Sequence, residues 1–294
     1  MPVDYRYHIG SFVAIFLALL LGILIGIGLQ PNPAYLDKVV GGLRKEFIET
    51  RRAKEAELQA LGQEKSQYES LAKEAVAGVI RSRLQGRRVA LVLNHEFDHD
   101  PLPDVLRALM KQSGATLSST TAVTRDFVEM PESMRQRVSE RFDLVPSPGV
   151  HFRTLVAEVL ARDIAQGRQE SVAFLQSLGL VKSSADSDYR LPVDTVLFIG
   201  GAGSSADASP ERIDLPLIAE LLRLGVHVVG CESSRCPASS IPLYKSKGIP
   251  TVDNADMLAG RMSVVLCLAG AKGHFGVKDT ADRFLPALST TGRP

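Results

Sequence analysis

The sequence lacks an excess of charge of either sign. It carries 34 lysines and arginines against 33 aspartates and glutamates, a formal net charge of +1. Nucleic-acid-binding domains need a basic surface to hold phosphates, so this balance argues against nucleic acid as a partner. Cysteine is also scarce: Cys231, Cys236 and Cys267 are too few for a disulfide framework and odd in number. At least one cysteine is therefore unpaired within the chain.

Charge is missing altogether from Ile9 to Gln30. At about 1.5 Å per residue, a helix of this length covers the roughly 30 Å hydrocarbon core of a bilayer. A helix satisfies its backbone hydrogen bonds within one segment, as a single membrane span must. Residues 9–30, after a short tail at 1–8, are therefore predicted to be a single transmembrane helix. This places the chain in the cell membrane, with the lipid bilayer as a partner.

A cleavable signal peptide is the first alternative to this anchor. Signal peptides have a shorter apolar core and a small-residue cleavage site, whereas this run ends in Leu29-Gln-Pro-Asn-Pro33. A buried core helix, the second alternative, is rarely so uniformly apolar. The basic residues that follow are mixed with acidic ones ahead of a long domain, and long domains cross membranes largely regardless of charge. Charge alone therefore leaves the orientation open.

Proline is absent from Tyr35 to Leu84, where apolar residues recur at three- and four-residue spacings among charged ones. This pattern is typical of an amphipathic helix. One helix over 34–85 has no core of its own, so the apolar stripe predicts a partner helix in a coiled coil, most simply a homodimer. Because Thr50, Lys54 and Glu64 interrupt the heptad, a solvated connecting helix without a partner is the alternative.

Two glycines in the predicted membrane span also concern whether the chain pairs with a second copy. Gly22 and Gly26 form a G-x-x-x-G pair, and glycines at this spacing let two helix backbones approach closely in a membrane. We expect this pair to be a contact between membrane helices. The sequence thus predicts a homo-oligomer held by the coiled coil and supported within the membrane.

Apolar segments alternate with helical patterns from residue 87 to 287. Strands are predicted at 88–94, 115–120, 195–199, 226–229 and 249–252, and helices at 104–112, 126–142, 211–224 and 255–268. Wholly apolar strands that alternate with helices are typical of a parallel sheet covered on both faces. The fold class is α/β: a transmembrane helix, a long coiled-coil helix and a parallel-sheet, Rossmann-like domain. Residues 146–192 are interpreted as an insertion and 288–294 as a disordered tail.

Imidazole and carboxylate groups gather in the loop after the first predicted strand. This loop contains His95, Glu96, Asp98, His99 and Asp100. It lies at the strand end where open α/β sheets bind ligands. The groups suit Cu(II), Zn²⁺ or Mn²⁺, with His95 and His99 as candidate ligands. Consecutive residues seldom all face one ion, so a solvated loop that caps the next helix is the alternative.

A glycine-rich segment, Gly200-Gly-Ala-Gly-Ser-Ser205, follows the third predicted strand. The backbone amides of Gly200, Gly201 and Gly203 are candidates for binding a phosphorylated small ligand, as in a sensor domain. Neither the G-x-G-x-x-G spacing nor a Walker lysine is present. Their absence favours a tight turn over the edge of the sheet.

Sulfur ligands of the kind that Cu(I) prefers occur towards the end of the chain. Cys231 and Cys236 can in principle bind it with Met257 and Met262. The cysteine spacing is not C-x-x-C, the methionine positions also suit a core, and the two cysteines can instead close a small disulfide loop outside the cytoplasm. No serine–histidine–aspartate, cysteine–histidine or paired-carboxylate set stands out, so we expect a non-catalytic protein.

Segments at the two ends of the chain carry a resemblance to a known family. One is the run Tyr7 to Gly26 with the coiled-coil pattern behind it. The other is Gly270-Ala-Lys-Gly-His-Phe-Gly-Val-Lys278, similar to a closing G-x-Y-G-x-K pattern with Phe275 in place of tyrosine, and accompanied by Val252-Asp-Asn254, Gly260 and Leu285-Pro286. Both ends resemble the MctB family, bacterial proteins described as copper transporters.

The resemblance implies a short cytoplasmic amino terminus, with the coiled coil and the α/β domain outside the cytoplasmic membrane. It implies a role in copper transport or homeostasis, with copper as the cofactor to expect. A related actinobacterial member, SteB, acts with a membrane partner, SteA, in separating daughter cells. That member implies an alternative class, a coiled-coil scaffold that recruits envelope or cell-division partners. An uncharged single span encloses no pore and has no group to relay an ion, so only the resemblance favours copper.

Overall fold

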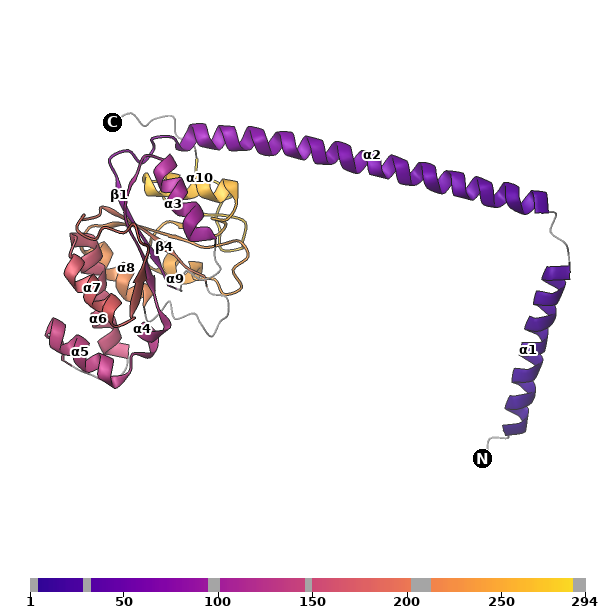
Figure 1. Cartoon of the computed structure of the whole chain (residues 1–294), viewed down its shortest axis with the longest axis horizontal. Helices are drawn as coiled ribbons and strands as arrows, with labels where there is room; N and C mark the ends of the chain where they lie inside the picture. Colours follow the sequence, from indigo (N-terminus) through magenta and orange to yellow (C-terminus); the bar gives the residue numbers. More distant parts are fainter. Residues whose placement is uncertain (1–4, 29–32, 95–100, 146–149, 202–212, 288–294) are drawn as a thin grey trace. The chain divides into compact units, whose positions relative to one another are not determined.

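The computed structural model of the chain describes residues 5–28, 33–94, 101–145, 150–201 and 213–287 (Figure 1). Several expectations fall outside these ranges: the candidate metal ligands His95 and His99, Gly203 of the glycine-rich segment, and the tail at 288–294. The chain divides into two compact units, residues 1–69 and residues 70–294.

The first unit begins with helix α1, Tyr5–Gly28. Its segment Ile9–Gly26 has a mean hydropathy of 2.7, and none of that segment is buried within the chain. By length and composition it is the one candidate membrane span among the described residues, which confirms the predicted amino-terminal apolar helix. Apart from the adjacent backbone of α1 itself, no described atom lies within 4 Å of the place where a Cβ on Gly22 or Gly26 would stand. Both glycines thus present an open helix surface.

Helix α2, Pro33–Ile80, is a single long helix. The helical pattern predicted over 34–85 is therefore confirmed up to Ile80, while its pairing as a coiled coil stays a prediction. The helix ends in a turn over residues 81–86, where Ser82 and Gly86 have φ values of 57° and 81°. Ile80 is only 1% exposed, so the end of α2 belongs to the core of the second unit.

A seven-stranded sheet in the order β3-β2-β1-β4-β5-β6-β7 forms the centre of the second unit. The strands are β1 (Arg88–Leu93), β2 (Thr116–Val123), β3 (Val181–Ser183), β4 (Thr195–Ile199), β5 (His227–Cys231), β6 (Thr251–Val252) and β7 (His274–Phe275). All neighbouring strands are parallel except β2 and β3, which pair antiparallel. The predicted parallel sheet is thus confirmed for most of its width and corrected at one edge, because β3 runs in the opposite direction.

Helices cover both faces of this sheet (Figure 1). They are α3 (Leu102–Gln112), α4 (Arg125–Glu129), α5 (Glu132–Phe142), α6 (Val150–Gln166), α7 (Gln169–Ser177), α8 (Asp214–Arg223), α9 (Ile241–Ser246) and α10 (Leu258–Leu268). Alternate residues of β1 supply the two cores: Ala90 and Val92 pack with α6 and α8, and Val89, Leu91 and Leu93 with α3 and α10. This two-sided burial explains why the strand is apolar at successive positions.

Helices α6 and α7 and strand β3, all within residues 150–192, contribute to one core layer. Helix α6 packs against α8, and its Phe152, Val156 and Leu160 are completely buried. Helices from this segment thus cover the sheet, and the interpretation of residues 146–192 as an insertion in the α/β domain stays a prediction. The segment 126–142, predicted to be mostly helical, consists of two helices, α4 and α5, because Pro131 has no N–H with which to continue the first one.

Asp163 lies on α6 within this layer and is 2% exposed. Arg168 Nη1 is 4.0 Å from Asp163 Oδ1. Burial disfavours the charged carboxylate and raises the pKa of Asp163 from an ordinary 3.8 to about 6, against the smaller opposing effects of Ser171 and Arg168. At pH 5 the folded protein therefore holds a proton that the unfolded chain releases.

Asp163→Asn is expected to stabilise the protein near neutral pH. Because the pKa is higher in the folded state, the free energy of unfolding falls as pH rises from about 4 to about 6 and is then constant. Asparagine cannot ionise, so the variant does not lose this free energy of unfolding as the pH rises. The melting temperature of the variant should match that of the wild type near pH 4 and exceed it by several degrees at pH 8. Thermal unfolding at both pH values checks this, and a difference independent of pH would contradict it.

Candidate functional site

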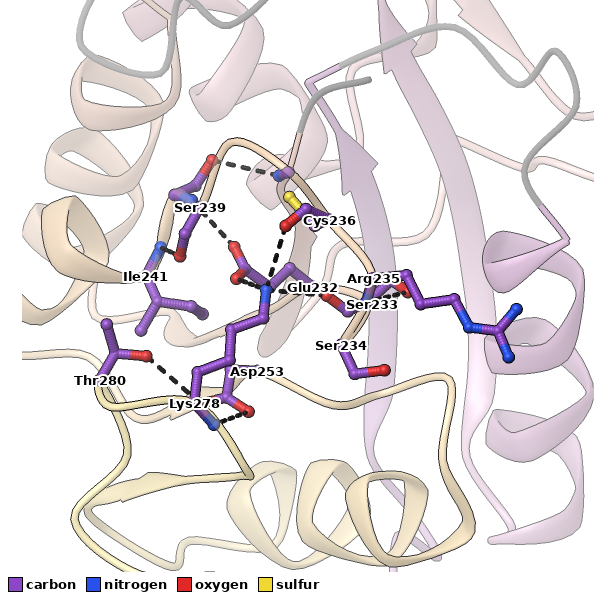
Figure 2. A network of polar contacts seen from close by, with 12 residues as sticks. Glu232, Ser233, Ser234, Arg235, Cys236, Ser239, Ile241, Asp253, Lys278 and Thr280 are labelled. Atoms are coloured by element: carbon purple, nitrogen blue, oxygen red, sulfur yellow. Dashed lines mark hydrogen bonds and ion pairs between the residues drawn. The ribbon is translucent and has the colours of Figure 1, made fainter. Parts of the chain in front are cut away.

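The carboxyl ends of three neighbouring parallel strands lead into charged side chains. Glu232 directly follows β5, Asp253 directly follows β6, and Lys278 comes three residues after β7. Parallel strands bring these ends to one edge of the sheet, where ligands bind in open α/β sheets. Figure 2 shows the three side chains converging there, with the loop from Ser233 to Cys236 beside them. We call Glu232, Asp253, Lys278 and their hydrogen-bond partners the carboxyl-edge network.

An ion pair between Glu232 and Lys278 lies at the centre of this network. Lys278 Nζ is 2.6 Å from Glu232 Oε1 and also donates to the carbonyl oxygen of Ser233 at 3.0 Å. The second oxygen of Glu232 accepts the backbone N–H of Ser240 at 2.9 Å. The side chain of Glu232 is completely buried. Its charge is thus paired and hydrogen-bonded on both oxygens, as a buried carboxylate requires.

Asp253 holds the segment that carries Lys278. Its Oδ1 accepts the N–H of Val277 at 2.7 Å, and its Oδ2 accepts the N–H of Lys278 at 3.2 Å and the hydroxyl of Thr280 at 3.3 Å. Gly276 permits this approach: its φ is +148°, and a Cβ there would lie 1.8 Å from Asp253 Oδ1. Only glycine fits at position 276. The hydrogen bonds to Asp253 thereby hold the backbone of Lys278 in place.

A second buried polar group ties β1 to α8 and α9. Asp214 Oδ2 accepts hydrogen bonds from the hydroxyl of Tyr244 at 2.5 Å and from Nδ2 of Asn94 at 3.0 Å. Burial, and then the nearby charge of Asp214, raise the pKa of Tyr244 well above its ordinary value. The phenol therefore stays protonated and donates to the carboxylate.

The described glycine candidates, Gly200 and Gly201, pack against their own chain. A Cβ on Gly200 would lie 2.5 Å from the hydroxyl of Tyr244, and one on Gly201 would lie 2.5 Å from Cys236 Sγ. The N–H of Gly201 donates to Ser240 Oγ at 3.1 Å. Close packing of the end of β4 on α9 and on the loop after β5 is thus sufficient to require glycine at both positions.

The candidate sulfur ligands differ in exposure. Cys231 is completely buried at the end of β5, whereas Cys236 is half-buried and donates its S–H to the carbonyl oxygen of Ala238 at 2.9 Å. Neither forms the small disulfide loop considered above. Met262 is buried and Met257 is exposed. Within the described residues, no three His, Cys, Asp or Glu side chains come together in a group that could hold a metal ion.

Comparison with known proteins covers almost the whole chain. The sequence profile of the family described as "Copper transport outer membrane protein, MctB" matches residues 3–286. The chain belongs to the MctB family. Proteins named "Copper transporter MctB" from Mycobacterium tuberculosis and Mycobacterium bovis are 22% identical to it, over 93% of this chain and 96% of theirs. The resemblance seen at the two ends of the sequence is thus confirmed.

The MctB match includes the carboxyl-edge network, which sequence reasoning found only in part. Asp253, Gly276 and Lys278 lie in the closing segments that carry the family resemblance, and that was the available signal. Glu232, 46 residues from its partner Lys278, had no local signature. Chemically the network is a structural ion pair. The ammonium of Lys278 neutralises the carboxylate of Glu232, and a metal ion would have to displace that ammonium in order to bind the carboxylate.

Proposed function

We propose that this chain is a single-span, membrane-anchored protein of copper transport or homeostasis, with a non-catalytic α/β domain outside the cytoplasm. The observation that carries the proposal is the MctB family match over residues 3–286. The apolar segment Ile9–Gly26 supports the membrane anchor. A single span has no enclosed pore and no charged group to relay an ion. We therefore assign any copper handling to the soluble part or to an assembly of several chains.

Copper binds to thiolate, thioether and imidazole groups in proteins. The candidate copper ligands in the soluble part are therefore cysteines and histidines. We propose His95 and His99, which follow β1, and Cys236, which follows β5. The strands that precede these residues in the sequence, β1 and β5, end at the same edge of the sheet. Cys231 is a weaker choice because it is completely buried.

The double variant His95→Ala/His99→Ala is expected to bind copper at least about tenfold more weakly than the wild type, because two imidazole ligands are lost. The measurement is a Cu(II) competition titration of the full chain in detergent against a chromogenic chelator, repeated with Cu(I) for Cys236→Ser. His151→Ala, which changes an exposed histidine on α6, is the matched control. Failure of the wild type to bind either ion would refute direct copper handling.

A second candidate function is a scaffold that recruits envelope or cell-division partners, as a SteB-like protein would. The length of α2 favours it, because a helix of 48 residues offers an extended surface for contact with other proteins. The phenotype of a deletion strain separates the two candidates. Copper sensitivity with normal division supports the first, and defective cell separation at unchanged copper tolerance supports the second.

A further inference from the structure

The apolar stripe on α2 is exposed along most of the helix and buried near its end. Nine large apolar side chains between residues 39 and 71 are 40–69% exposed: Val39, Val40, Leu43, Phe47, Ile48, Leu58, Leu61, Tyr68 and Leu71. Further along the helix, Val76 and Val79 pack against the core of the second unit. The last turns of the stripe are thus part of the core of the second unit, whereas its side chains from Val39 to Leu71 are exposed.

The spacing of the exposed residues keeps them on one face. Leu43, Leu61 and Val79 are 18 residues apart, which is five turns at about 3.6 residues per turn. At about 100° per residue, the exposed set apart from Ile48 falls within an arc of about 140°. A strict heptad drifts around a straight helix and imposes a supercoil, whereas this seam does not drift. Two such helices can therefore pair while remaining nearly straight.

We propose that a second copy of this chain covers α2 from Val39 to Leu71, in a parallel and in-register helix pair. The pair spans about 50 Å of helix. The candidate span α1 precedes α2 in both copies, so both α2 helices start at the same bilayer and run in the same direction. The inference rests on the proposed membrane anchor and is independent of copper.

The polar residues in the stripe favour a second copy over an unrelated apolar helix. Thr50 and Lys54 lie in line with Leu43 and Leu61 and divide the seam into two apolar parts. In a parallel, in-register pair, Lys54 of one copy lies beside Glu57 of the other, about one turn along. A polar residue at a seam position selects register and oligomeric state at some cost in stability. A matching copy supplies this complementary charge.

Cysteine crosslinking of the full chain in native membranes tests the proposal. The background is Cys236→Ser, since the other two cysteines are buried. Leu61→Cys lies in the seam, and Gln63→Cys, about 200° around the helix, is the matched control. Both native side chains are exposed. A short bismaleimide is expected to yield at least about tenfold more dimer from Leu61→Cys, because residue 61 of one copy faces residue 61 of the other in a parallel, in-register pair.

Equal crosslinking at the two positions would overturn the proposal. So would a Leu61→Cys product containing a different protein, or no product from Leu61→Cys at all. Resistance of each variant to alkaline extraction from the membrane is measured in parallel. Retention in the membrane without a dimer would refute the helix pair and leave the anchor intact, whereas extraction of the chain would refute the anchor itself.

Discussion

Lys278→Met is expected to destabilise the α/β domain by about 3–5 kcal/mol, because it leaves the buried carboxylate of Glu232 without its cation. Glu232 is completely buried, and the pair is only 2.6 Å apart. For a domain of this size the melting temperature should fall by about 10 °C. Differential scanning fluorimetry of the full chain in detergent measures the change.

Lys245→Met is the matched control for this prediction. Lys245 Nζ lies 3.2 Å from Asp282 Oδ1, but their side chains are 31% and 59% exposed, and such pairs contribute at most about 1 kcal/mol. Adding Glu232→Gln to Lys278→Met should recover part of the lost stability, because the unpaired charge is then gone. Equal losses of stability from the two lysine variants would show that the buried ion pair contributes no more than the exposed one.

Gly276→Ala is expected to cost more than about 4 kcal/mol, which places it among the most damaging single substitutions. The added Cβ would stand 1.8 Å from Asp253 Oδ1, at a φ of +148° that side chains rarely adopt. Asp253 would have to move and release the backbone N–H groups of Val277 and Lys278. The melting temperature and the yield of folded protein report the loss.

Gly248→Ala is a control that measures backbone strain without a steric clash of the kind expected between residue 276 and Asp253. Gly248 also has a positive φ, +70°, but apart from its two chain neighbours no described atom lies within 4 Å of its added Cβ, so we expect a loss of about 1–2 kcal/mol. If contact with Asp253 causes the larger effect, Gly276→Ala combined with Asp253→Ala should lose less than the sum of the two single changes. Strict additivity would contradict this cause.

Much of the fold could be predicted from local pattern. The strand predicted at 195–199 coincides with β4, and α1 and α2 lie close to the predicted helical segments. These elements are long or uniformly apolar, so their periodicity is distinct. β7, with two residues, and β3, with three, were missed, because so few residues show no period and are set by pairing with a neighbouring strand.

The candidate site was less predictable than the fold. Sequence reasoning selected Gly200, Gly201, Cys231 and Cys236 for their residue type and spacing. The structure places Gly200 and Gly201 in close packing with Tyr244 and Cys236. Hydrogen-bonded groups such as Asp214 with Tyr244 are formed by side chains 30 residues apart. Spacing along a chain does not report such contacts, because they depend on the order of strands in the sheet.

The sequence by itself determined the apolar amino-terminal helix, the long helix behind it, the α/β alternation and the likeness to the MctB family. These features follow from residue periodicity and composition, which act locally on the backbone. Only the tertiary structure decided that Lys278 reaches Glu232, that Gly276 must lack a side chain, and that the exposed stripe on α2 ends near Leu71. Packing of the whole core sets the positions of those residues, so no local segment contains that information.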